Sequence, residues 1–109
     1  MTVHDLTEKL ALRPLSLANE ERELSGVYIG DLLSWVMGRA SCDNVWITIM
    51  SNINIIAVAA LADVSCIVLA EGVTLEESVL TTAKQKGINV FSTEKTAYEV
   101  AAELARLGL

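Results

Sequence analysis

Residues 45–50 read VWITIM, a nearly continuous apolar run that is rich in β-branched side chains. Such a run predicts a strand that is buried on both faces, which is typical of a parallel sheet covered by helices. Trp46 lies inside this strand and is expected to belong to the core. Similar apolar runs alternate with helical patterns in the rest of the chain, so the same architecture is expected there.

On the C-terminal side of this strand, helix and strand patterns alternate to the end of the chain. They predict an alanine-rich helix over 54–62, a strand over 66–69, a helix that starts with a Thr74–Glu77 capping box and stops at Gly87, a strand over 88–91 and a helix over 94–107. Because parallel strands are joined by right-handed crossovers, this order predicts a mostly parallel sheet with helices on its faces.

On the N-terminal side of this strand, the sequence patterns predict shorter helices and strands. These are a helix over 3–11 capped by Thr2 and ended by Pro14, strands over 15–18 and 24–29, and a helix over 31–39 capped by Asp31, with Leu32, Leu33 and Val36 facing inward. No repeat or long linker interrupts the chain. We therefore expect a single three-layer α/β domain over residues 1–109.

Composition and charge limit the partners of the chain. It has 109 residues and a formal net charge of −6, and its eight basic residues are scattered singly. A basic patch is needed to bind nucleic acid or anionic membranes, so neither is expected as a partner. The apolar stretch over 53–70 approaches the length of a membrane span, but Asn54, Asp63 and Ser65 interrupt it. With no signal-peptide pattern at the N-terminus, we expect a soluble, cytoplasmic protein.

The residues that commonly perform catalysis or bind metals are few. Cys42, predicted in a loop, and Cys66, predicted in a buried strand, are far apart in sequence, and the one histidine, His4, is near the N-terminus. This set does not provide a zinc site, a cysteine–histidine pair or a glycine-rich phosphate loop. We therefore expect no enzymatic activity, no metal and no cofactor.

A binding site is expected where the parallel strands end, because the helix N-termini point to that edge of the sheet. The candidate ligand-binding residues in the loops there are Ser51, Asn52, Asn54, Glu71, Gly72, Ser92, Thr93 and, in the following helix, Tyr98. Acidic residues outnumber Lys95, the only base of these loops, so a neutral polar ligand is favoured over a phosphate. The alternative is that the polar side chains only cap helices.

Trp35 is the candidate interface residue, because aromatic side chains are enriched where proteins meet. It follows Ser34 on the less apolar side of its helix, so packing in the core remains the alternative.

Four segments of the chain resemble the DRTGG domain family. They are Val45–Ile49 leading to Ser51–Asn52, Cys66–Gly72, Ile88–Glu99 and Ser25–Leu33, and Ser92–Thr93–Glu94 with Tyr98–Glu99 is the most specific part. The resemblance implies a fold like that of the N-terminal domain of HPr kinase. It also implies an accessory module of the kind found in some phosphate acetyltransferases and in pyrophosphatases with CBS domains.

The chain departs from the residues that give this family its name. The aspartate and arginine correspond to Asn52 and Ile53, and the threonine and two glycines correspond to Ala70, Glu71 and Gly72, so only Gly72 is retained. The resemblance implies a bacterial, stand-alone regulatory or ligand-sensing module that forms a homodimer. The alternative is a ligand-free interaction subunit that docks on a kinase, a phosphotransferase or a redox-enzyme system.

Overall fold

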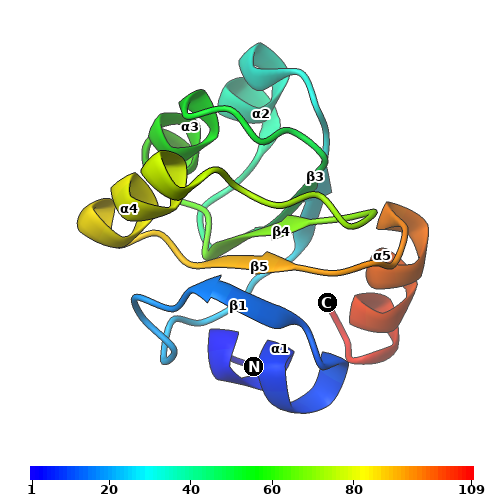
Figure 1. Ribbon diagram of the computed structural model, residues 1–109. Helices are drawn as coiled ribbons and strands as arrows, with labels where there is room; N and C mark the ends of the chain where they lie inside the picture. Colours follow the sequence, from blue (N-terminus) through cyan, green and yellow to red (C-terminus); the bar gives the residue numbers. More distant parts are fainter.

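The computed structural model describes residues 1–109, and its centre is a five-stranded sheet (Figure 1). The strands are β1 (Arg13–Ser16), β2 (Val27–Ile29), β3 (Val45–Thr48), β4 (Cys66–Leu69) and β5 (Val90–Ser92). Their order is β1-β5-β4-β3-β2, in which β2 to β5 are parallel and β1 is antiparallel to β5. The prediction of a mostly parallel sheet is confirmed.

Helices cover both faces of this sheet and complete the three layers (Figure 1). They are α1 (Val3–Leu10), α2 (Leu33–Arg39), α3 (Asn54–Ala62), α4 (Glu77–Lys86) and α5 (Ala97–Arg106). α2, α3 and α4 join the parallel strands and pack on one face, whereas α1 and α5 pack on the other face. No helix is long and apolar enough to cross a bilayer.

The two central strands are buried on both faces, as the apolar runs predict. Every residue of β3 and β4 is buried. Val45 and Ile47 pack toward α1 and α5, and Trp46 packs toward α3. The indole N–H of Trp46 donates a hydrogen bond to the carbonyl of Gly30 at 3.0 Å. This bond replaces the hydrogen bond to water that the indole N–H loses when the side chain is buried.

The N-terminal boundaries differ from the predicted ones. The first helix ends at Leu10, because Ala11 adopts a left-handed conformation with φ 53°. Pro14 does not stop that helix but lies within β1. A proline is accepted there because β1 is an edge strand and its free side needs no N–H donor. The second strand is shortened to Val27–Ile29, since Gly26 has φ 76°.

Two predicted helix caps were wrong. Asp31 does not cap α2; its carboxylate accepts hydrogen bonds from the Thr48 hydroxyl at 2.7 Å and the Ile49 N–H at 3.0 Å, and so binds the start of α2 to the end of β3. Leu32, expected to face inward, is half exposed because it lies before the helix begins. The Thr74–Glu77 box is absent, because α4 begins only at Glu77 itself.

The end of the chain also starts its elements later than predicted. The last strand begins at Val90, although the Asn89 carbonyl still accepts a hydrogen bond from the Ile67 N–H of β4 at 2.9 Å. The closing helix begins at Ala97, where Thr96 and Glu99 form a capping box: the Thr96 hydroxyl accepts from the Glu99 N–H at 3.2 Å and the Glu99 carboxylate accepts from the Thr96 N–H at 3.1 Å. Residues 93–96 therefore form a loop.

Asn89 joins the β1–β2 connection to the sheet. It is 3% exposed, and its Oδ1 accepts hydrogen bonds from the N–H groups of Ala18 and Asn19, each at 2.8 Å. Its Nδ2 donates to the carbonyls of Asn19 and Ser65, each at 3.0 Å. One buried amide therefore satisfies four backbone groups from two other parts of the chain.

The loop between β4 and α4 requires a glycine at residue 72. Glu71 and Gly72 both adopt left-handed conformations, with φ 60° and 76°. A Cβ on residue 72 would lie 2.5 Å from Oε2 of Glu94, in the loop between β5 and α5. Gly72 thus permits both the turn and the close approach of the two loops.

We expect Asn89→Ala to lower the free energy of unfolding by about 3 kcal/mol, because it leaves one buried and three part-buried backbone groups without their hydrogen-bond partner. Urea denaturation measures this change. Asn19→Ala is the matched control: the Asn19 side chain bonds only the exposed N–H of Glu21, so its loss should cost less than about 1 kcal/mol. Equal losses for the two variants would contradict this account of Asn89.

We expect Gly72→Ala to lower the free energy of unfolding by about 1–2 kcal/mol, the cost of a left-handed conformation for a residue with a Cβ. The Glu94 side chain is exposed and can move aside, so the strain lies in the backbone. Denaturation of Gly72→Ala in a Glu94→Ala background should show the same loss. If the loss disappears in that background, the contact with Glu94 is the cause instead.

Candidate functional site

The loops that carry the predicted residues, 51–54, 70–74 and 92–95, do lie at the carboxyl edge of the sheet, but they line two separate cavities. The N–H groups of Glu71 and Gly72 donate to the carbonyls of Lys95 and Thr93, each at 2.8 Å, and these bonds hold the second and third loops together. The first loop, residues 51–54, instead lines a separate cavity with Thr74 and residues that lead into α4. The predicted residues therefore do not form a single pocket.

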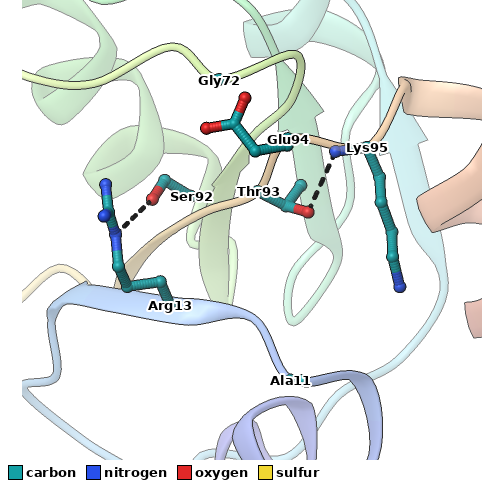
Figure 2. A pocket seen from close by; sticks show the side chains of 7 residues that line it. All are labelled: Ala11, Arg13, Gly72, Ser92, Thr93, Glu94 and Lys95. Carbon is teal, nitrogen blue, oxygen red and sulfur yellow. Dashed lines mark hydrogen bonds between the residues drawn. The ribbon is translucent and has the colours of Figure 1, made fainter.

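A cavity of about 320 Å³ opens beside the joined loops (Figure 2). We call it the Arg13 cavity; its lining residues are Ala11, Arg13, Gly72, Ser92, Thr93, Glu94 and Lys95. It lies next to the point where successive helices change faces, because α4 packs on one side of the sheet and α5 on the other. Open α/β sheets bind ligands at such switch points.

Arg13 is the residue of this cavity that sequence analysis missed. It lies in β1, which runs antiparallel to β5 and pairs Arg13 with Ser92. The Arg13 Nε donates to the Oγ of Ser92 at 3.3 Å, and Ser92 is 4% exposed (Figure 2). Only the pairing of the first strand with the last places Arg13 here, and no local sequence signal gives that pairing.

Of the two basic side chains that line the Arg13 cavity, one forms an ion pair and the other does not. The Lys95 ammonium lies 2.6 Å from the Glu103 carboxylate and points away from Arg13 (Figure 2). Arg13 forms no ion pair, so its guanidinium is the free cation of the cavity. The Glu94 carboxylate lies between Gly72 and Ser92 (Figure 2). Lys95 is the only base of these loops, as expected, but β1 brings a second base, Arg13, to the same cavity.

The first loop lines a second cavity of about 460 Å³, together with residues that lead into α4. Its lining residues are Ser51, Asn52, Ile53, Thr74, Glu76, Ser78 and Val79. Asn52 acts there as a turn former, because its Oδ1 accepts the N–H of Asn54 at 2.9 Å. No basic side chain lines this cavity. It is therefore a weaker candidate for an acidic ligand than the Arg13 cavity.

The other predicted site residues lie outside both cavities. Asn54 starts α3 and lines a groove between α3 and α4. Glu71 contributes its backbone N–H and not its carboxylate. Tyr98 is 79% exposed on α5 and lines neither cavity. Trp35 is half exposed, with the Arg39 guanidinium 3.7 Å from the centre of its ring, so it does not belong to the core.

Neither thiol is arranged as a nucleophile. Burial raises the pKa of Cys66 to about 12. Cys42 is exposed, and its thiol donates to Oδ2 of Asp63 at 3.1 Å, which raises the pKa of the thiol and lowers that of the carboxyl group. Beside Cys42, the Arg22 guanidinium forms ion pairs with Asp63 at 2.9 Å and with Asp43 at 2.8 Å. A raised thiol pKa opposes thiolate chemistry at neutral pH.

His4 lies on α1 and contacts two carboxylates at the surface. Its Nδ1 lies 3.2 Å from Glu20, and its Nε2 lies 3.6 Å from Glu8. The hydrogen bond to Glu20 raises the pKa of His4. None of these residues lines the Arg13 cavity.

Comparisons with known proteins agree with this fold. No curated protein matches the sequence. A solved structure, the CBS and DRTGG domains of the regulatory region of Clostridium perfringens pyrophosphatase in complex with its activator, diadenosine tetraphosphate, superposes with a TM-score of 0.73. The two sequences are 14% identical, and the match covers 94% of this chain but only 45% of that one.

The family assignment comes from the sequence itself. The model of the DRTGG domain matches residues 16–107, which include β2 to β5 and α2 to α5 in full. The resemblance noted in the sequence is confirmed, and so is the fold that it implies. The chain belongs to the DRTGG domain family.

Proposed function

We propose that this chain is a regulatory module, non-catalytic in itself, that binds a small polar ligand with an acidic group in the Arg13 cavity. The observation that supports this proposal is the unpaired guanidinium of Arg13, held against the buried hydroxyl of Ser92 at the switch point of the sheet. A guanidinium binds carboxylate or phosphate groups through charge-assisted hydrogen bonds. Residues 1–109 act as a single module in this proposal.

The charges around the cavity favour a ligand with one acidic group. Arg13 is the one free cation, and Glu94 at the same opening repels additional negative charge. The related pyrophosphatase region was solved with diadenosine tetraphosphate, which carries several phosphates. A ligand with that many charges fits this cavity poorly, so a smaller acid is favoured for this chain.

A homodimer is part of the proposal, and so is a bacterial, cytoplasmic setting. Large apolar side chains that are about half exposed support self-association, among them Trp35 on α2 and Ile29 on β2. The family assignment supports the regulatory role. The ligand-free interaction subunit is the second candidate, because the same exposed side chains suit the docking of a partner enzyme.

We expect a small acidic ligand to raise the melting temperature of the chain, because binding to the folded state alone stabilises it. The probes are inorganic phosphate, succinate, nucleoside monophosphates and diadenosine tetraphosphate. For a probe that binds, calorimetry should show an affinity at least about 10-fold lower for Arg13→Gln, as expected when a charged hydrogen bond is lost.

Arg106→Gln is the matched control, because it removes the same charge from an exposed position near the end of α5. It should leave the affinity unchanged. Equal affinities of Arg13→Gln and the wild type would show that the ligand binds elsewhere. If none of the probes binds, the interaction subunit becomes the favoured function.

A further inference from the structure

The two edges of the sheet differ in how they are protected. β1 carries the usual protection of an edge strand: a proline at residue 14, the charge of Arg13 and an irregular register between Pro14 and Ser16. β2, at the other edge, consists of Val27, Tyr28 and Ile29, without charge, proline or bulge. Ile29 is 49% exposed. The short length of β2 is its only protection, and its unpaired backbone groups can still pair with a strand of matching length.

The backbone of β2 leaves two residues open to such a strand. The Val45 N–H donates to the Gly26 carbonyl at 3.0 Å, and the Gly30 N–H donates to the Ile47 carbonyl at 3.2 Å. Because alternate residues of a strand direct their polar groups to the same side, Tyr28 also faces β3. The N–H and carbonyl groups of Val27 and Ile29 therefore point away from the sheet.

We propose that β2 pairs with β2 of a second copy of this chain, in antiparallel orientation about a two-fold axis at Tyr28, which joins the two sheets into one. In this register Val27 lies opposite Ile29 of the partner subunit, and each such pair exchanges both of its hydrogen bonds. This pairing gives a hydrogen-bond partner to the outward N–H and carbonyl groups of Val27 and Ile29 in both copies. A two-fold interface requires this self-complementarity.

The side chains fit a second copy as well. No charged residue lies within β2, so the antiparallel arrangement brings no like charges opposite each other despite the net charge of −6. Ile49, which follows β3 and is 48% exposed, lies beside Asp31 and extends the apolar surface next to Ile29. The inference rests on the homodimer of the proposed function but does not involve the Arg13 cavity.

The mass of the full chain in solution tests this inference. Light scattering should give a dimer for the wild type and half that mass for Ile29→Lys, because lysine on an edge strand opposes pairing. Leu61→Lys is the matched control: Leu61 is 72% exposed on α3, and its replacement should leave a dimer. Circular dichroism and the melting temperature show whether each variant is folded.

A cross-link gives a second, independent measurement. In the proposed register Tyr28 lies opposite its own copy in a pair without hydrogen bonds, where the Cα atoms are about 4.5 Å apart, within the range that a disulfide spans. In a Cys42→Ser background, Tyr28→Cys should form a disulfide-linked dimer on mild oxidation. Ile29→Cys in the same background should link far less, because Ile29 lies opposite Val27.

These experiments distinguish two questions: whether the chain forms a dimer, and whether the dimer forms through β2. A monomeric wild type overturns both the homodimer and the β2 pairing. A dimer that persists in folded Ile29→Lys, with no cross-link in Tyr28→Cys, overturns the β2 pairing alone. Binding of a ligand to the Arg13 cavity is measured separately and is expected to be the same in Ile29→Lys as in the wild type.

Discussion

Burial of β3 and β4 on both faces is the constraint on which the rest of the structure depends. Two adjacent strands with no exposed residue need a helical layer on each side. Right-handed crossovers place α2, α3 and α4 on one face, so the other face has to be covered from the two ends of the chain, by α1 and α5. The change of face after β5 produces the site.

The N-terminal segment therefore has a structural role and a chemical role together. α1 closes the layer that α5 begins, and the strand that follows it pairs antiparallel with β5. That pairing places a guanidinium at the end of β5, where an all-parallel sheet of this chain would have only Glu94 and a neutralised Lys95. It also leaves β2 as the one edge without proline or charge.

The family assignment and the site give complementary information about function. The residues that name the DRTGG family are absent here except Gly72, which has a structural reason to remain, because the loop is left-handed there and approaches Glu94 closely. Arg13, the free cation of the cavity, precedes the residues that match the family. The likeness to a larger pyrophosphatase regulatory region shows the fold, and the chemistry of this chain has to be inferred from its own residues.

The sequence by itself determined the buried strands, the helices after them and the layers, because apolar runs and helical spacing are local patterns that burial enforces. The parallel direction of β3 to β5 and the burial of Trp46 and Cys66 followed from these patterns. Tertiary structure alone decided that Asp31 does not cap its helix, because its carboxylate binds Thr48 and Ile49 instead. It also divided the loop residues between two cavities and brought Arg13 to one of them, because contacts between residues about 80 positions apart depend on the pairing of whole strands, which no local pattern encodes.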